Sequence, residues 1–214
     1  MLVTIIDYGL SNLLSVQRAV EYCGETARIA SDPGAFEGSD ALILPGVGAF
    51  ADGMNHLNAL GLTGPIRDWV AAGKPFLGIC LGMQMMFSSS EEGPGVPGLG
   101  IIGGEVVRIP ALTAGGMPQR VPHVCWEEVQ PADTVRKTFF DGVPDNSAFY
   151  FVHSYQGMPA DPARTAAVCT YGGRMVTAAV MNEAGNALGC QFHPEKSSHA
   201  GLRVLHNFLK TAEK

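Results

Sequence analysis

The sequence has few charged residues and no concentration of positive charge. Only 16% of its 214 residues are charged, and the 14 lysines and arginines nowhere form a run. The formal net charge is −6 at pH 7. Because nucleic acids and anionic membranes attract proteins through clustered basic side chains, we expect this chain to bind neither.

Closely spaced cysteine pairs and long apolar runs are also absent. The five cysteines include no C-x-x-C pair, so neither a disulfide framework nor a zinc finger is expected. The first residues lack the basic segment that opens a signal peptide. The longest apolar stretches, at 41–44 and 175–181, are too short to cross a bilayer. We therefore expect a reduced, cytoplasmic protein.

The chain reads as one domain over residues 1–214, since it contains no internal repeat, low-complexity segment or linker. Its first half alternates short apolar runs with segments whose apolar residues recur at helical spacing. These patterns predict strands at 2–6, 41–44 and 76–79, and helices around 13–23, 54–60, 65–72 and 81–87. Strands without polar alternation, separated by helices, are typical of a parallel sheet covered on both faces.

The second half changes character from about residue 101. Short strand-like runs occupy 106–109, 148–152, 174–180 and 187–192, and a last helix is expected at 201–210. The predicted fold class is α/β: a three-layer, mixed, largely parallel sheet flanked by helices, with added antiparallel strands. Ligands of such sheets bind at the carboxyl ends of the strands, where the turns after Leu44 and Ile79 lie.

The segment Gly78-Ile79-Cys80-Leu81-Gly82 has the G-x-S-x-G pattern of a nucleophile elbow, with cysteine in place of serine. It lies between a predicted strand and a predicted helix, as that motif requires. The flanking glycines allow a sharp turn and leave room for a substrate beside the sulfur. The alternative role of Cys80 is that of a small buried hydrophobic side chain.

A cysteine nucleophile needs a base, and His193 is the best candidate. It ends an apolar run in Gln191-Phe192-His193-Pro194-Glu195, where Pro194 stiffens the backbone. Glu195 can then hold the imidazole in the tautomer that accepts the thiol proton. A solvated His-x-Glu pair is the alternative, but its combination with the elbow cysteine in one α/β chain favours catalysis.

A third segment, Pro45-Gly46-Val47-Gly48, follows the predicted strand at 41–44. Glycine-rich turns expose backbone N–H groups that can bind an oxyanion or a phosphate. This turn is no Walker A loop, because the terminal Gly-Lys-Ser/Thr is missing. A plain strand-to-helix turn is the alternative.

These three segments and several others together carry a resemblance to a known protein family. The resemblance extends from Ile5 to about Phe208. The others are Ile6-Asp7-Tyr8-Gly9, Gly98-Leu99-Gly100, Val121-Pro122-His123, Tyr150-Phe151-Val152-His153-Ser154-Tyr155 and Lys196-Ser197. In these segments the chain resembles the class I (triad) glutamine amidotransferases, and among them the glutaminase subunits of imidazole glycerol phosphate synthase.

The resemblance implies a glutaminase without a metal or a cofactor. According to this resemblance, Cys80 attacks the side-chain amide of glutamine, His193 transfers the protons, and Glu195 orients His193. The resemblance assigns the oxyanion hole to Gly46, Val47, Gly48 and Leu81. It assigns glutamine binding to Gly48, Gln84, His153, Ser154 and Tyr155.

The resemblance also implies a heterodimer, in which ammonia passes to a (β/α)8-barrel cyclase subunit of histidine biosynthesis. That partner makes imidazole glycerol phosphate and aminoimidazole carboxamide ribotide. The positions matching its interface or communication route are Asn12, Trp126, Tyr150 and Lys196, for which ordinary packing is the alternative. Three residues depart from the family pattern: Ser11 and Cys125 replace glycine, and Glu127 replaces asparagine.

Other functions stay open at this point. The chain could be the glutaminase of another class I amidotransferase, such as that of anthranilate synthase, although that relative normally has histidine at the position of Met83. It could also be a non-catalytic regulatory subunit that has kept the fold. A small-molecule thiol hydrolase is the remaining alternative, but Gln84 and the segment 151–155 argue against it.

Overall fold

Eight strands form the main sheet of the computed structural model, which describes residues 1–93 and 95–212. Their order is β2-β1-β3-β4-β13-β12-β11-β8. The parallel part consists of β2 (Thr26–Ala30), β1 (Leu2–Ile6), β3 (Ala41–Gly46), β4 (Phe76–Cys80) and β13 (Ala187–Cys190). The antiparallel part consists of β12 (Arg174–Met181), β11 (Thr165–Tyr171) and β8 (Gln130–Pro131).

The parallel strands are apolar throughout because both of their faces are buried. In β3, Ala41 and Ile43 belong to one hydrophobic core, whereas Leu42 and Leu44 belong to the core on the other side of the sheet. Since neighbouring side chains on a strand point to opposite faces, each face needs its own apolar residues. This explains the run without polar alternation.

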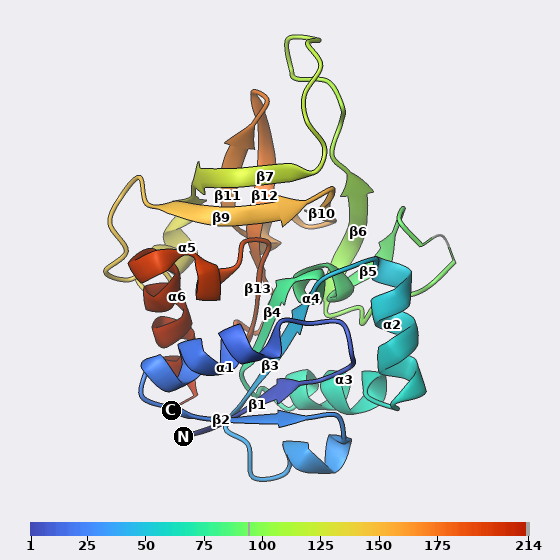
Figure 1. Cartoon of the computed structure of the whole chain (residues 1–214), viewed down its shortest axis with the longest axis vertical. Helices are drawn as coiled ribbons and strands as arrows, with labels where there is room; N and C mark the ends of the chain where they lie inside the picture. The colour runs from blue at the N-terminus through green and yellow to red at the C-terminus, as the bar shows by residue number, and fades with distance from the viewer. Residues whose placement is uncertain (94, 213–214) are drawn as a thin grey trace.

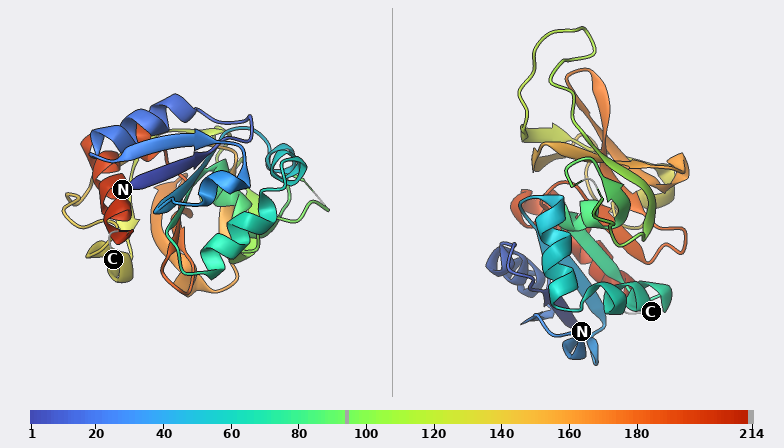
Figure 2. Two further views of the ribbon diagram at one scale, coloured as in Figure 1. Left: turned by 90° about the horizontal axis from the view of Figure 1, so that it is seen from below. Right: turned by 90° about the vertical axis from the view of Figure 1, so that its right-hand side faces the viewer.

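Helices cover both faces of the parallel part (Figure 1; Figure 2, left). One core is closed by α1 (Leu13–Tyr22) and α6 (Ser198–Thr211), and the other by α2 (Phe50–Ala59) and α3 (Thr63–Ala71). Pro65 lies in the first turn of α3, where its missing N–H interrupts no helical hydrogen bond. The result is three layers.

Two smaller sheets lie beyond the carboxyl edge of the parallel strands, in the upper half of Figure 1. One contains β10 (Tyr155–Pro159), β6 (Ile102–Arg108) and β5 (Phe87–Ser90), and the other pairs β7 (His123–Glu128) with β9 (Ala148–His153). The remaining elements are short: α4 (Leu81–Met85), α5 (Asp133–Arg136), η1 (Pro33–Phe36), η2 (Pro162–Arg164) and η3 (Pro194–Lys196).

The overall architecture is the expected one, but β2, β7, β8, β10 and β11 lie outside the predicted runs, and several bounds differ by a few residues. Two of these local differences have a clear physical reason. The helix predicted at 81–87 ends at Met85, and Phe87 begins β5. The Phe87 ring packs against Gly157 of β10, where an added Cβ would lie 2.3 Å from the ring, so a tertiary contact ends the helix. The strand predicted at 41–44 continues to Gly46, because Pro45 and Gly46 still pair with β4.

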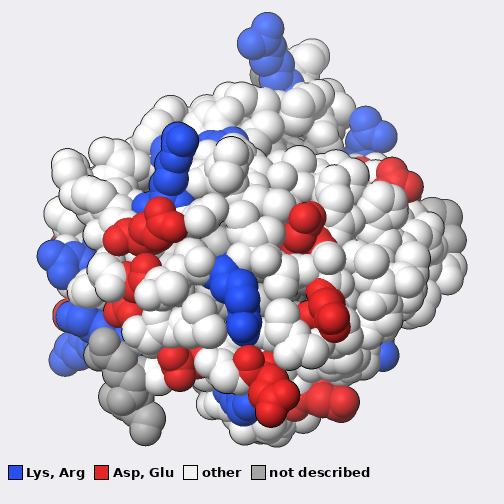
Figure 3. Space-filling view, turned by 60° about the horizontal axis from the view of Figure 1, so that its bottom comes forward, with Lys and Arg blue, Asp and Glu red and all other residues white. Residues whose placement is uncertain are grey.

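The lengths of the helices and the charges on one face of the surface are as follows. Among the described residues, no helix is both long and apolar enough to cross a membrane. On the face drawn in Figure 3, acidic and basic side chains are interspersed among uncharged ones.

Candidate active site

Cys80 ends β4 and directly precedes α4 with a backbone conformation that L-residues rarely adopt, φ 54° and ψ −109°. Two glycines permit this turn. An added Cβ at Gly82 would lie 1.8 Å from the Leu44 carbonyl oxygen, and one at Gly78 would lie 2.8 Å from the Gly82 backbone. The sharp turn holds the thiol at the carboxyl edge of the sheet, as in a nucleophile elbow.

His193 reaches the same edge because β13 lies beside β4, with Cys190 opposite Ile79. The imidazole Nδ1 lies 2.8 Å from Glu195 Oε1, and both side chains are almost fully buried. The Nδ1–H donates to the carboxylate, and Nε2 is buried without a hydrogen-bond partner among the described residues.

The charge of His193 follows from this environment. Burial alone would lower the pKa of His193, but the Cys80 thiol and the Glu195 carboxylate together outweigh burial and raise that pKa to about 9. The imidazole therefore retains a proton near neutral pH. A protonated imidazole beside a thiol is the arrangement that a thiolate nucleophile requires.

The turn Gly46–Gly48 lies against Cys80 because β3 and β4 pair with Gly46 opposite Cys80. Gly46 has no room for a side chain, since a Cβ would lie 2.0 Å from the Tyr8 hydroxyl. The Val47 N–H donates to the Leu10 carbonyl at 2.9 Å, so in this conformation it is not available to a ligand beside Cys80.

Leu81 offers a second N–H at the same place. It is the first residue of α4, and the first N–H groups of a helix have no acceptor within that helix. Of the four residues expected to form an oxyanion hole, Val47 has its amide bonded to Leu10, whereas the Leu81 amide has no hydrogen-bond acceptor recorded among the described residues.

A cavity of about 240 Å³ lies beside Cys80. Eight of the expected site residues line it: Val47, Gly48, Cys80, Leu81, Gln84, His153, Ser154 and Tyr155. Pockets for drug-sized ligands measure about 300–1,000 Å³, so this one suits a smaller molecule such as an amino acid. A larger hollow of about 660 Å³ beside α6 contains none of the expected site residues.

Comparison with known proteins agrees with this geometry. Residues 4–212 match the family described as Glutamine amidotransferase class-I. The Imidazole glycerol phosphate synthase subunit HisH 1 of Legionella pneumophila (strain Lens) is 44% identical over 211 residues, which cover 97% of this chain and 98% of that protein. This chain belongs to the class I glutamine amidotransferases, in the HisH subunit family.

Other comparisons agree. The HisH subunit of Moorella thermoacetica is 46% identical over 207 residues, covering 96% of this chain and 93% of that protein. A solved glutamine amidotransferase superposes with a TM-score of 0.72 at 21% identity, covering 99% of both chains. PurLQS from Thermotoga maritima gives 0.72 at 19% identity, covering 98% of both chains. The structures show the shared fold, and the word subunit in the HisH names implies a partner in a complex.

In this HisH-family chain, Gln84 is fixed by two acceptors at the cavity wall. Its side-chain nitrogen donates to the Tyr155 carbonyl at 3.0 Å and to Gln191 Oε1 at 3.1 Å. The Gln191 nitrogen in turn donates to Cys80 Sγ at 3.8 Å. Because the side-chain nitrogen of Gln84 already has two acceptors, the side-chain carbonyl oxygen is the atom that remains for a ligand.

A pair of histidines continues the hydrogen bonding away from the cavity. His153 Nδ1 donates to the Tyr155 carbonyl at 2.8 Å, and His153 Nε2 lies 2.9 Å from His123 Nδ1. Burial lowers the pKa of His153 to about 3 and that of His123 to about 4, so both are neutral near pH 7. His153 Nε2 therefore accepts from His123 Nδ1–H, and His123 Nε2 carries a lone pair.

The four residues matching the interface occupy different elements. Trp126 on β7 is 52% exposed, and its ring lies 5.9 Å from the Tyr150 ring, which lies 6.3 Å from His193. Asn12 precedes α1 and Lys196 ends η3, and both are exposed. The structure thus joins Tyr150 and Trp126 to the candidate catalytic pair.

Glu92 was not predicted from the sequence, yet it lines the cavity and accepts from the Phe50 N–H at 2.8 Å. Its neighbours form no recognisable pattern, and only the fold brings it to Cys80. The contact of Gln191 with Cys80 was not predicted either, although Gln191 stands two residues before His193. That proximity was the one available signal.

Proposed function

We propose that this chain is the glutaminase subunit of an imidazole glycerol phosphate synthase and supplies ammonia to a partner subunit. The observation that carries the proposal is the Cys80 thiol beside the buried His193–Glu195 pair, at the wall of a cavity of amino-acid size. The identity to HisH subunits over nearly the whole chain supports it.

The first half-reaction forms a thioester. The Cys80 thiolate attacks the side-chain amide carbon of glutamine, and the amide oxygen becomes an oxyanion. The oxyanion then collapses, the C–N bond breaks, and His193 Nε2–H gives its proton to the leaving nitrogen. Ammonia departs, and a γ-glutamyl thioester remains on Cys80.

The second half-reaction hydrolyses the thioester and regenerates the free enzyme. His193, now neutral, takes a proton from a water molecule at Nε2, and the hydroxide attacks the thioester carbon. The C–S bond breaks, and the thiolate forms again beside the imidazolium. The γ-carboxylic acid of the product loses its proton to solvent, and glutamate leaves. Glu195 accepts from Nδ1–H throughout, which keeps Nε2 as the atom that exchanges protons.

Charge complementarity supports an amino-acid substrate. The α-ammonium group of glutamine needs acceptors, and the cavity wall provides the Glu92 carboxylate and the Gln84 carbonyl oxygen. The backbone of residues 153–155 closes the same cavity. Glu92 is thus a substrate-binding residue in this proposal, in addition to those expected from the sequence.

The Val47 amide suggests how activity is controlled. In the proposed reaction the oxyanion accepts from the N–H groups of Leu81 and Val47, but the Val47 N–H is bonded to Leu10. The peptide between Gly46 and Val47 must therefore turn before the oxyanion hole is complete. Loss of one such donor typically lowers kcat by about 10²–10³, so we expect the free subunit to be a slow glutaminase.

The proposed partner is a (β/α)8-barrel cyclase. Ammonia released into neutral water would be protonated, and ammonium is no nucleophile, so direct transfer within a complex serves the reaction. Binding of the partner beside Trp126 and Tyr150 is the event we expect to turn the Val47 peptide.

The test is Cys80→Ala in the complex with the cyclase. We expect glutamine-dependent synthesis to be lost by more than about 10³-fold, because the nucleophile is gone, while ammonia-dependent synthesis continues. Cys23→Ser, which removes a thiol that does not line the cavity, should change neither rate. Equal loss of both activities in Cys80→Ala would refute the assigned role.

A further inference from the structure

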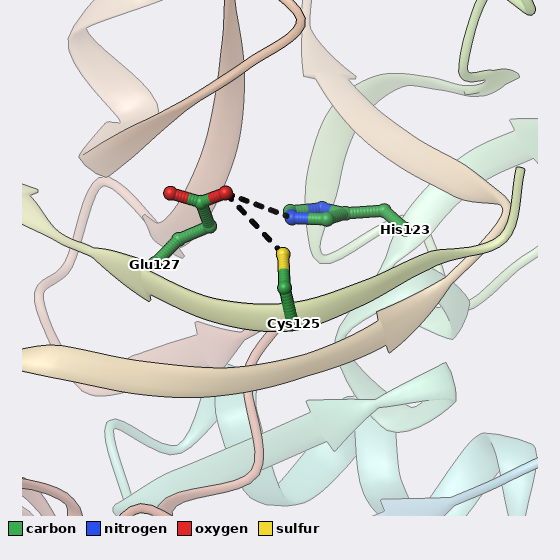
Figure 4. A group of neighbouring side chains, drawn as sticks. All are labelled: His123, Cys125 and Glu127. Carbon is green, nitrogen blue, oxygen red and sulfur yellow. Dashed lines mark hydrogen bonds and ion pairs between the residues drawn. The ribbon is translucent and has the colours of Figure 1, made fainter. Parts of the chain in front are cut away.

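Three side chains with different donor atoms share one face of β7, outside the glutamine cavity. His123, Cys125 and Glu127 stand at alternate positions of the strand and therefore point to the same side (Figure 4). Their ligand atoms all lie within 4.8 Å of one another. Glu127 Oε1 lies 3.3 Å from Cys125 Sγ and 3.9 Å from His123 Nε2.

The buried imidazole lacks a partner at the atom that faces this group. His123 is fully buried, and its Nε2 has no hydrogen-bond partner among the described residues. Its other nitrogen donates to His153, so Nε2 presents a lone pair rather than a proton. A lone pair beside a carboxylate leaves two acceptors facing each other, an arrangement that a cation satisfies.

We propose that His123 Nε2, Cys125 Sγ and Glu127 Oε1 bind a borderline-soft divalent metal ion of the zinc class. Nitrogen, sulfur and carboxylate oxygen are the donors of protein zinc sites, whereas magnesium and calcium take oxygen only. Bonds of about 2.0–2.3 Å in tetrahedral geometry place ligand atoms roughly 3.3–3.6 Å apart. Small side-chain shifts bring the three donors to these separations.

The surroundings hold the imidazole in the orientation that the ion needs. The His123 ring stacks on Tyr171 at 3.9 Å and on Phe151 at 5.3 Å between ring centroids. The hydrogen bond to His153 fixes its tautomer, as second-shell partners do for metal-bound histidines. Cys125 and Glu127 are partly exposed, which gives an ion a path from solvent and leaves the fourth position to water.

Binding replaces the thiol proton of Cys125, which leaves to solvent as the metal–sulfur bond forms. No metal site was predicted from the sequence, because the five cysteines include no C-x-x-C pair. Cys125 and Glu127 are also two of the three departures from the family pattern.

Cobalt(II) is the probe, because a tetrahedral cobalt–thiolate site has intense visible bands and a near-ultraviolet charge-transfer band. The full-length Cys80→Ala protein is titrated, so that the candidate nucleophile cannot bind the ion. We expect one equivalent to bind with both sets of bands, and zinc to displace the cobalt. Absence of stoichiometric binding would overturn the proposal, whatever the glutaminase activity of the wild type.

Two variants in the same background assign the ligands. Cys125→Ser should lose the charge-transfer band and bind cobalt at least about tenfold more weakly. Glu127→Gln should keep the band but also bind more weakly. Cys23→Ser, which removes another partly buried thiol, should match the parent. A charge-transfer band that survives in Cys125→Ser, with native circular dichroism, would place the metal elsewhere and refute the site.

Discussion

The protonation of His193 depends on neighbours that oppose burial, and this gives a prediction for a single residue. Its pKa of about 9 arises because Cys80 and Glu195 outweigh desolvation. Glu195→Gln removes one of these contributions, so we expect the His193 pKa to fall toward its ordinary value of about 6.5. An NMR titration of the imidazole measures it.

The same shift ties folding stability to pH. Because the pKa of His193 is higher in the folded than in the unfolded chain, its stabilising contribution is complete below about pH 6.5 and is lost as the pH rises through about 9. The stability advantage of the wild type over Glu195→Gln should therefore shrink across this range in urea titrations. Glu92→Gln, which removes a cavity carboxylate not bonded to His193, is the control. An unchanged His193 pKa in Glu195→Gln would contradict the analysis.

The chemistry-bearing residues were accessible from sequence because they are close together along the chain. Cys80 stands between two glycines, and His193 and Glu195 flank one proline, so each group is recognisable within five residues. The bond from Val47 to Leu10 and the pairing of His123 with His153 join positions that the sequence pattern does not connect. These contacts depend on register and could not be predicted.

At the scale of elements, β9 connects the exposed surface to the candidate catalytic pair. The Tyr150 carbonyl accepts from the His193 N–H at 3.0 Å, and the Tyr150 N–H donates to Ser197 Oγ at 2.9 Å. The Tyr150 ring lies between Trp126 and His193. A partner that contacts Trp126 on β7 therefore touches the strand paired with β9, and Tyr150 of β9 is hydrogen-bonded to His193 and to Ser197.

Trp126→Ala tests this surface. An exposed tryptophan at an interface commonly contributes about 2 kcal/mol or more, so we expect the cyclase to bind about thirtyfold more weakly. Titration of the labelled subunit with the cyclase measures the affinity. Met175→Ala removes another exposed apolar side chain, on β12, and should leave the affinity unchanged. Equal effects of the two substitutions would place the interface elsewhere.

Strands that are apolar runs and helices with a regular apolar spacing were predicted better than elements that depend on tertiary contacts. The strands at 2–6 and 76–79 and the helix beginning at Leu13 agree with β1, β4 and α1. By contrast, β5 was missed because the apolar residues of 81–87 fit a helix, and the contact of Phe87 with Gly157 decides otherwise. The pairing of β7 with β9 was invisible because it joins strands about 30 residues apart along the chain.

At the scale of the whole molecule, one hydrophobic core joins the parallel sheet to the strands above it. The core that contains Val3 and Ile5 of β1 also contains Phe149 and Phe151 of β9. The main sheet is continuous from β2 to β8 across the change from parallel to antiparallel strands. We therefore expect residues 1–214 to unfold as one domain, although many chains of this length do not.

The two tryptophans make that expectation testable, because they report on different regions. Trp69, a residue of α3, is buried in the core that α2 and α3 close, and Trp126 lies on β7. In urea, Trp69→Phe and Trp126→Phe should each give one fluorescence transition whose midpoint matches that variant's own far-ultraviolet dichroism. Adding Leu188→Ala, a core truncation in the shared sheet, should lower stability by about 2–5 kcal/mol in both proteins and shift both midpoints together. If only the Trp69 signal moved, the upper strands would be a separate folding unit, because a shared core cannot lose packing for one half alone.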